Sequence, residues 1–293
     1  MRRGLVQIGW LFCLGAFCTA ALAQSRDADL LRAKFVALQG ALRQNQFQRP
    51  LVLDSSENSN RLQGEIHATV AYPFGLVKAG LSDPAHWCDV LLLHVNTKFC
   101  RAAPGPAGTV LRVSIGKKTP QELADVAHVD FRYRLVSETS DFFAVALDAP
   151  EGPLGTSGYR IRLEAVALPN DQTFLHLSYS YDMSFTGRLA MQTYLATLGS
   201  GKLGFSVQGL TTDGQPDFIS GVRGVVERNT MRYYLAIDAY LSARRSLPEA
   251  QFEQRLQAWF TAVERYPRQL HELDRLAYLE MKRAEQQRQQ TLP

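Results

Sequence analysis

The sequence predicts an α+β fold in which a curved antiparallel sheet grips a long C-terminal helix, with extra helices at both ends of the chain. Two observations carry this prediction. Segments between residues 62 and 185 alternate apolar and polar side chains, as strands with one buried face do. Later, Val222–Leu241 is apolar on two sides at helical spacing, which is typical of a helix buried between two layers.

Residues 1–23 have the composition of a secretory signal peptide. Arg2 and Arg3 precede an uncharged apolar run, and Ala21-Leu22-Ala23 supplies the small residues of a cleavage site. An uncleaved membrane anchor is the alternative, because the run is almost long enough to span a bilayer. The polar residues from Gln24 onward favour cleavage. We therefore expect an exported, soluble protein, in a Gram-negative periplasm.

The charge of the remaining chain is close to balanced. Without Arg2 and Arg3, the 32 basic residues fall to 30, against 28 acidic residues. A nucleic-acid-binding surface needs a basic excess on one face. We therefore expect no nucleic-acid partner.

Cys88 and Cys100 are the cysteines that remain after the signal peptide. Two thiols this close in an oxidising compartment usually form a disulfide. A zinc site that also uses His86 and His94 is the alternative, but these spacings match no familiar zinc pattern. We predict the disulfide, and neither a metal site nor a cofactor.

The N-terminal segments lead into the predicted sheet. Helical spacing predicts a helix over 28–42, and the polar stretch 54–60 is typical of a turn. A period of two begins at Leu62 and ends at Pro73. Short helices are expected over 74–81 and from Asp83-Pro84, because proline is tolerated in a first turn.

Further segments are predicted as strands of the same sheet. Most have one apolar and one polar face, whereas residues 141–147 are apolar on both. Pro169-Asn170-Asp171 has the composition of a hairpin turn. Such strands form an antiparallel sheet covered on one side, with helices on its concave face. The predicted strands are 96–101, 109–117, 128–137, 141–147, 158–168 and 172–185.

The C-terminal part is predicted to be helical. Residues 187–198 have weak helical spacing, and 199–221 have the composition of a loop. Ser246 and Glu249 fit a capping box before a helix that Pro267 bends or splits. Residues 283–293 are expected to be a solvated tail. The expected parts are a signal peptide (1–23), an N-terminal helix and loop (24–61), the sheet with its closing helix (62–243), and a helical extension with tail (244–293).

The order of these elements resembles the START-like, or Bet v 1-like (SRPBCC), helix-grip superfamily over about residues 62–241. The local sequence similarity that supports this resemblance is Val70-Ala71-Tyr72-Pro73-Phe74, followed by Leu81-Ser82-Asp83-Pro84 and Trp87. The resemblance implies a cavity between sheet and final helix that holds lipids, sterols, polyketides or other apolar molecules. The insertion at 187–221 and the helices over 247–286 depart from the pattern and can plug or cover that cavity.

The candidate ligand-binding residues are polar groups that we place between the sheet and the closing helix. A buried tyrosine hydroxyl needs a hydrogen-bond partner, which is either the polar end of a ligand or a side chain of that helix. Core packing alone is the alternative. The candidates are Tyr133, Tyr159, Tyr179 and Tyr181 on the strands and Asn229, Thr230 and Tyr233 on the helix.

Two polar groups on the opposite face of the strands were also considered. His176, Ser178, Ser180 and Asp182 include the residue types of a hydrolase triad, but neighbours along one strand face lie about 6.6–6.8 Å apart. No Gly-x-Ser-x-Gly motif occurs in the chain, so a solvated face is preferred. The second group is either cross-strand ion pairs or a docking surface for acidic partners. It comprises Arg132, Arg134, Arg160, Arg162 and Glu164.

The sequence thus predicts an exported protein that binds an apolar or amphipathic, lipid-like ligand and has no catalytic residue. A cyclase-like enzyme on the same scaffold is one alternative, with His67, Glu227 or Asp238 as its acid or base, although His67 is predicted to face outward. A non-catalytic scaffolding protein of the envelope is another, whose helices over 24–42 and 247–286 would grip a partner. Contact with a membrane surface or an envelope protein stays open, as does the oligomeric state.

Overall fold

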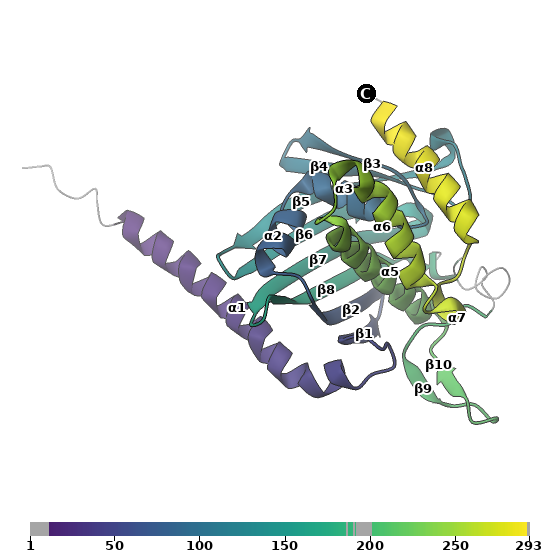
Figure 1. The fold of residues 1–293 in the computed structure, drawn as a ribbon, viewed down its shortest axis with the longest axis horizontal. Helices are drawn as coiled ribbons and strands as arrows, with labels where there is room; N and C mark the ends of the chain where they lie inside the picture. Colours follow the sequence, from purple (N-terminus) through teal and green to yellow (C-terminus); the bar gives the residue numbers. More distant parts are fainter. Residues whose placement is uncertain (1–11, 186, 190, 192–200, 292–293) are drawn as a thin grey trace, which may run out of the picture.

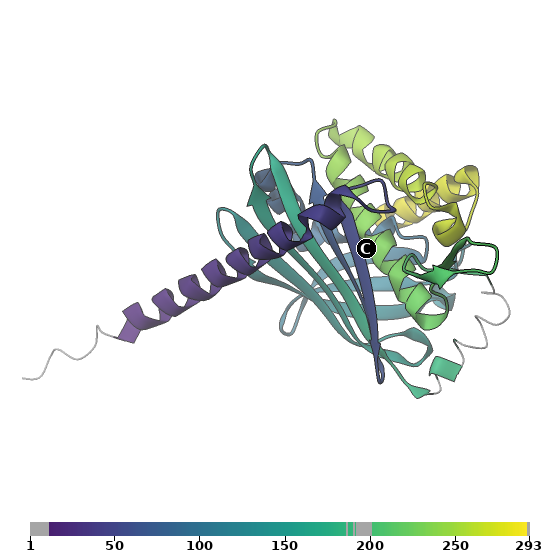
Figure 2. The ribbon, with the colours of Figure 1, turned by 90° about the horizontal axis from the view of Figure 1, so that it is seen from below.

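The computed structural model describes residues 12–185, 187–189, 191 and 201–291, with side chains from residue 26 onward. One antiparallel sheet lies at its centre (Figure 1). Helices α2, α3 and α5 lie on one face of this sheet and α1 on the other (Figure 2). Helix α6 covers α5 from behind, and α8 packs against α6 and β3. The predicted α+β fold, a curved sheet that grips a long helix, is confirmed.

The central sheet has eight strands in the order β1-β2-β8-β7-β6-β5-β4-β3. Every neighbouring pair is antiparallel, and consecutive strands pair except where β2 joins β8. The turn between β7 and β8 is the predicted one, with Asn170 and Asp171 in the left-handed conformation that such hairpins favour. The strands are β1 Leu51–Asn58, β2 Arg61–Val70, β3 Thr97–Gly105, β4 Gly108–Ile115, β5 Ala127–Glu138, β6 Phe142–Glu151, β7 Thr156–Leu168 and β8 Gln172–Met183.

The helices follow the predicted order. Asp83 caps α3 through a hydrogen bond from the backbone N–H of Ala85, and Pro267 separates α6 from α7. The predicted disulfide between Cys88 and Cys100 is confirmed and joins α3 to β3. The helices are α1 Phe12–Arg43, α2 Phe74–Leu81, α3 Pro84–Leu92, α5 Gly221–Ala243, α6 Pro248–Val263, α7 Pro267–Leu270 and α8 Arg275–Thr291.

Two polar segments are strands where we predicted turn or loop. Residues 54–58 belong to β1, which pairs with β2 along its whole length. Residues 199–221 contain a small hairpin of β9 Val207–Leu210 and β10 Pro216–Phe218. The exposed residues of these strands do not alternate apolar and polar side chains. Backbone hydrogen bonds form the strands, so the sequence there shows no period of two. The helix predicted over 187–198 lies largely outside the described residues.

The outer face of the sheet is partly covered, whereas we predicted a sheet buried on one side only. Ala28 and Leu31 of α1 pack against Phe142 and Phe174 in a second, smaller core. This contact explains why residues 141–147 are apolar on both faces.

The predicted C-terminal tail is wrong as far as Thr291, because these residues belong to α8. Glu285 is buried between the ammonium groups of Lys98 and Lys282, at 3.0 and 2.8 Å. Burial lowers the pKa of Lys282 to about 8. The expected capping box is also not formed, since α6 begins at Pro248 with Leu247 as its N-cap.

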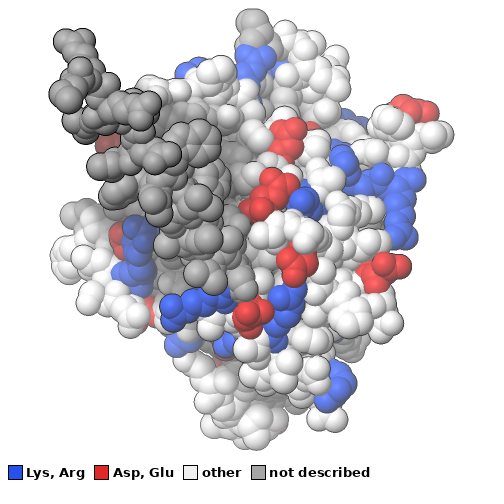
Figure 3. Space-filling model, turned by 90° about the vertical axis from the view of Figure 1, so that its left-hand side faces the viewer, with Lys and Arg blue, Asp and Glu red and all other residues white. Residues whose placement is uncertain are grey.

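The surface carries mixed charge on the side toward which the N-terminal end of α1 points. Figure 3 shows Lys and Arg side chains interspersed there with Asp and Glu side chains. The described residues of this face therefore present no large area of a single charge. Within the part of the chain that the structure describes, no helix is both long and apolar enough to cross a membrane.

Helix α5 touches the sheet most closely at Gly64 of β2. A Cβ atom at this position would lie 2.3 Å from the Thr230 hydroxyl oxygen and 3.4 Å from the carbonyl oxygen of Val226. The Thr230 hydroxyl donates a hydrogen bond to that same carbonyl, at 2.7 Å. No side chain fits between strand and helix here, so glycine sets the distance between them.

We predict that Gly64→Ala lowers the free energy of unfolding by about 1–3 kcal/mol, because the added methyl group overpacks this contact. Gly75→Ala is the control, since a Cβ there has nothing within 4 Å and alanine favours a helix. Urea denaturation measures both. Adding Thr230→Ala to Gly64→Ala should recover part of the loss, and equal stability of Gly64→Ala and wild type would contradict the close contact.

A buried carboxylate clamps the C-terminal helices onto α5. Glu272 accepts hydrogen bonds from Arg232 at 2.7 Å and Lys202 at 2.9 Å, and Lys118 lies 2.7 Å away. Burial alone would raise the pKa of Glu272, but these three cations hold it at about 2. The carboxylate is therefore ionised over almost the whole acid range.

The clamp should contribute stability above the unfolded-state pKa of glutamate, about 4.5, and lose it as the pH falls toward 2, because the folded-state pKa is the lower one. Glu272→Gln should therefore cost on the order of 3 kcal/mol at pH 7 and progressively less below pH 4. Denaturation of both proteins between pH 3 and 7 measures this difference. A difference that does not depend on pH would rule out the clamp.

Candidate functional site

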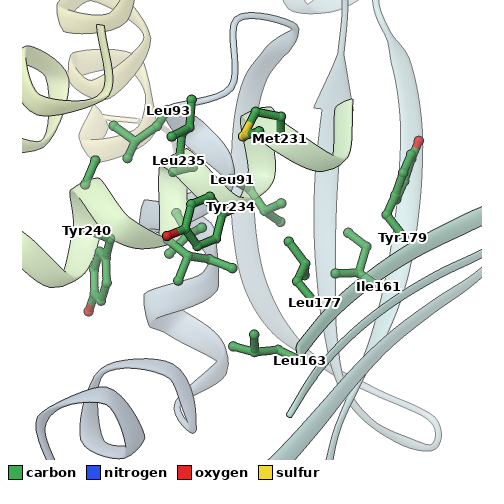
Figure 4. Close-up of a cluster of buried hydrophobic side chains, with 14 of the residues drawn as sticks. Leu91, Leu93, Ile161, Leu163, Leu177, Tyr179, Met231, Tyr234, Leu235 and Tyr240 are labelled. Atoms are coloured by element: carbon green, nitrogen blue, oxygen red, sulfur yellow. The ribbon is translucent and has the colours of Figure 1, made fainter. Parts of the chain in front are cut away.

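The centre of the interior is filled by side chains. Figure 4 shows Leu91 of α3, Met231 and Leu235 of α5, and Leu163 and Leu177 of the sheet converging on one another. All of these residues are buried. Together with the contact at Gly64, this packing limits any space for a ligand to the edges of the layer between sheet and helix.

Four tyrosines form an aromatic cluster at one edge of this layer, and we call them the tyrosine cluster. The rings of Tyr159 and Tyr181 stack with their centroids 5.3 Å apart, and Tyr179 lies 5.5 Å from Tyr181. Tyr233 of α5 completes the cluster 5.2 Å from Tyr179, and its other neighbour is the ring of His94 at 5.1 Å. The structure thus brings together four of the predicted site residues from β7, β8 and α5.

The hydroxyl groups of this cluster are unevenly satisfied. The Tyr159 hydroxyl lies 2.8 Å from the hydroxyl of Thr156, and Asn229 of α5 faces Tyr179. Tyr181 and Tyr233 form no hydrogen bond with another described residue. Burial raises the pKa of the Tyr179, Tyr181 and Tyr233 hydroxyls, so all three are protonated donors at neutral pH.

Three residues around the cluster keep accessible surface although they face the interior. Tyr159, Asn229 and Tyr233 are only partly buried. Leu177 and Met231, farther along the same layer, are fully buried. The layer therefore meets accessible surface at the tyrosine cluster, whereas its centre is fully buried.

Two other predicted site residues have contacts that need no ligand. The Tyr133 hydroxyl donates to the backbone carbonyl of Ser82, between α2 and α3. The Thr230 hydroxyl is occupied by Val226 and packed on Gly64. Neither residue belongs to the tyrosine cluster.

The three residues considered for a cyclase-like enzyme also have structural contacts. His67 faces the outer side of the sheet, as predicted, and is buried there. Asp238 pairs with Arg49 at 2.9 Å and accepts a hydrogen bond from Tyr72 at 3.1 Å. None of the three places an acid or base at the tyrosine cluster.

Glu227, the third of these, fastens the chain on either side of α5. Its carboxylate accepts hydrogen bonds from the hydroxyl of Ser55 in β1, at 2.6 Å, and from the hydroxyl of Ser206, at 2.7 Å. The backbone N–H groups of Phe205 and Ser206 donate to it at 2.6 and 2.9 Å. Both oxygens are thus fully used.

The polar residues of β8 do not form a catalytic triad. Asp182 is engaged by Arg61 through two hydrogen bonds, at 2.9 and 2.7 Å. His176 contacts Glu164 and Glu65 on the neighbouring strands instead of Ser178 or Ser180. The preference for a non-catalytic face agrees with these contacts, although the face is less solvated than predicted.

The predicted arginine group surrounds an open cleft of about 650 Å³ on the outer face. Arg134 pairs with Asp148 at 2.6 Å, and Arg162 pairs with Glu164 at 2.8 Å. These pairs are the cross-strand contacts that we considered as one interpretation. Arg132 and Arg160 line the same cleft with their charges toward solvent.

Sequence reasoning missed a cluster of histidine and glutamate side chains on this outer face. His67 of β2, His176 of β8 and Glu65 of β2 place possible metal-ligating atoms within 4.8 Å of one another. Alternation already assigned these residues to the polar face. The register between β2 and β8, which brings them together, could not be read from the sequence.

No protein-family model and no curated protein match the sequence of this chain. Solved structures are similar to it at low identity. The human StAR-related lipid transfer protein 5 shares 11% identity, with a TM-score of 0.38 over 76% of this chain and 100% of that one. The Zhui aromatase/cyclase from Streptomyces sp. R1128 shares 15%, with a TM-score of 0.32 over 70% and 94%. A START superfamily protein from Mycobacterium smegmatis shares 14%, with a TM-score of 0.33 over 48% and 90%.

The chain has a helix-grip fold, and this statement rests on its own element order. One strand pair, two short helices, six further strands and a long helix follow one another as the predicted resemblance to the START-like and Bet v 1-like superfamily requires. At such low identity, the solved structures add nothing on ligand or activity.

We predict that Glu227→Gln acts on structure. An amide nitrogen in place of one oxygen would face backbone donors, and a buried donor left unsatisfied costs about 1–3 kcal/mol. The amide protons of Phe205 and Ser206 should then exchange faster with solvent. Glu253→Gln is the control, because its pair with Arg283 is exposed to solvent and holds no buried segment. Unchanged exchange at Phe205 would show that Glu227 does not hold this segment.

Proposed function

We propose that this protein binds an apolar or amphipathic molecule between the sheet and α5, with the polar end of the molecule at the tyrosine cluster. The observation that carries the proposal is the pair of hydroxyls of Tyr181 and Tyr233. They lie in an apolar layer and form no hydrogen bond with another described residue. A tyrosine hydroxyl in an apolar layer normally has a partner, and a carboxylate, hydroxyl or carbonyl group of a ligand would accept from either one.

The chemistry of the surroundings supports binding without catalysis. Pockets for small molecules are mostly apolar, with a few polar groups that set orientation. Tyr159 and Tyr179 would supply apolar area, and Asn229 a further polar contact. His67 lies on the opposite face of the sheet, and Glu227 and Asp238 are engaged by other residues, so the cyclase-like alternative lacks the acid or base that we considered for it.

Export is the second part of the proposal. We infer that residues 1–23 direct the chain across a membrane and are removed after Ala23. The helix α1 continues through this position. Among residues whose side chains the structure describes, its core contacts with the sheet start at Ala28, and cleavage after Ala23 would leave these contacts intact. The mass of the protein from its own host tests this, because an intact N-terminus would contradict cleavage.

Ligand binding is tested with protein purified from its own host and with dansyl-labelled undecanoic acid as a probe. We expect native mass spectrometry to detect a bound small molecule, and the stripped protein to enhance the fluorescence of the probe. Tyr181→Phe and Tyr233→Phe should each weaken probe binding about 3–10-fold, because each removes one hydrogen bond of about 1 kcal/mol.

Tyr133→Phe is the matched control, since its hydroxyl binds Ser82 and should not affect the probe. Absence of both a co-purifying molecule and probe binding would contradict the proposal. Equal effects of all three substitutions would place the ligand away from the tyrosine cluster.

A further inference from the structure

The histidine and glutamate cluster lies on the opposite face of the sheet from the tyrosine cluster. The strand register places His67 of β2 directly opposite His176 of β8, which in turn lies opposite Glu164 of β7. Glu65 precedes His67 by two residues and therefore shares its face. Side chains in such a row have Cβ atoms about 4.5–5.5 Å apart. The fold itself thus brings two imidazoles and two carboxylates together.

The two imidazoles carry nitrogen atoms that no described residue satisfies. His67 is only 4% exposed, and its Nδ1 is buried without a hydrogen-bond partner in the described part of the chain. The same holds for Nε2 of His176, whose nearest carboxylate oxygen, on Glu65, is 3.6 Å away. Each buried polar atom without a partner needs an explanation, and two such imidazole nitrogens beside a carboxylate are explained by a bound ion.

The other atoms of the cluster are held in place. Nδ1 of His176 lies 2.9 Å from Glu164, and Arg162 donates to the second oxygen of Glu164 at 2.8 Å. Gln63 donates to Oε1 of Glu65, which leaves Oε2 toward His176. A carboxylate behind a histidine is the usual arrangement at a metal-bound imidazole, because it fixes the tautomer and the ring orientation.

We propose that Glu65, His67 and His176 bind one divalent transition metal ion, of which Zn²⁺ fits the ligand set best. Two imidazole nitrogens and one carboxylate oxygen are the protein ligands of zinc sites that keep one position for water. That position would face an open cleft of about 340 Å³, lined also by Asp27 and Lys34 of α1.

The geometry needs little adjustment to hold such an ion. Zinc lies about 2.0–2.2 Å from its ligands, so ligand atoms on one ion are about 3.3 Å apart. The three candidate atoms now lie within 4.8 Å of one another, a distance that side-chain rotation can close. Phe174, a residue of the smaller core between α1 and the sheet, packs against His67 with ring centroids 6.0 Å apart. The ion would tie β2 to β8, the pair that joins β1 and β2 to the rest of the sheet.

The alternative is that these side chains form an ion-pair network without a metal ion. Burial lowers the pKa of His176, but Glu164 and Glu65 outweigh it and raise the value to about 9. His176 is then a cation that is hydrogen-bonded to Glu164 and lies 3.6 Å from Glu65. This arrangement leaves Nδ1 of His67 without a partner. His67 is neutral here, because burial and the neighbouring His176 lower its pKa to about 4. The two imidazole rings stack with their centroids 4.3 Å apart.

The proposal is tested by titrating the chelator-treated, untagged protein with Zn²⁺ in a calorimeter, and with Co²⁺ for its visible absorption. We expect one ion per chain, with a Kd of about 1 μM or tighter. His67→Gln and His176→Gln should each weaken binding at least about 100-fold, and Glu164→Gln about 10–100-fold. His128→Gln, on an exposed position of the same face, should leave binding unchanged.

Circular dichroism checks that each variant folds, and Glu65→Gln replaces any histidine variant that does not. The proposal is overturned if the folded wild-type protein binds no Zn²⁺ at a tenfold molar excess over about 10 μM protein. It is also overturned if Zn²⁺ binds with equal affinity to wild type, His67→Gln and Glu65→Gln. Absorption of bound Co²⁺ that is lost in these variants would place the ion at the cluster.

Discussion

The arrangement of this molecule depends on the contact between Gly64 and Thr230. Helix α5 approaches β2 so closely that no side chain fits between them, and the Thr230 hydroxyl is turned back onto its own helix. This contact fixes where α5 crosses the sheet. The central layer is then filled by aliphatic side chains, and Tyr159, Asn229 and Tyr233 at the tyrosine cluster keep accessible surface. The place that we propose for a ligand follows from the position of one glycine.

Buried carboxylates anchor the segments that this chain adds to the simple helix-grip pattern. Glu227 holds residues 205 and 206, which precede α5, and Glu272 joins the segment before α8 to α5. Glu285 of α8 lies between two buried lysines. An unpaired buried charge is strongly destabilising, whereas one with several donors is tolerated. These contacts specify where the added segments dock, and they explain why α8 is ordered despite its polar composition.

Much of this fold was predictable because burial leaves a periodic signal. The alternation in β2, β5, β7 and β8, the two-sided helix α5 and the Cys88–Cys100 disulfide all follow from simple patterns. Strand β1 and the helix beyond Arg283 were missed, since exposed backbone pairing and buried charges leave no such pattern. The rotation of α5 was equally hidden, so Glu227 and Asp238 remained open as catalytic candidates until their partners were seen.

The candidate sites show the same limit. The alternation correctly predicted that Tyr159, Tyr179 and Tyr181 point inward. It could not predict the separate contact of Tyr133 with Ser82. It also directed His67 and His176 outward, while their meeting depends on strand register and their burial depends on α1. The sequence of one strand shows which of its residues share a face of the sheet, whereas a site depends on how several strands are aligned.

The central claim is that the layer between the sheet and α5 is closed at Gly64 and can bind a ligand at the tyrosine cluster. A high-resolution crystal structure of the protein purified from its own host tests this most directly. We predict electron density of a bound molecule in contact with the hydroxyls of Tyr181 and Tyr233. Side chains that close over these hydroxyls, with no density between them, would contradict the account.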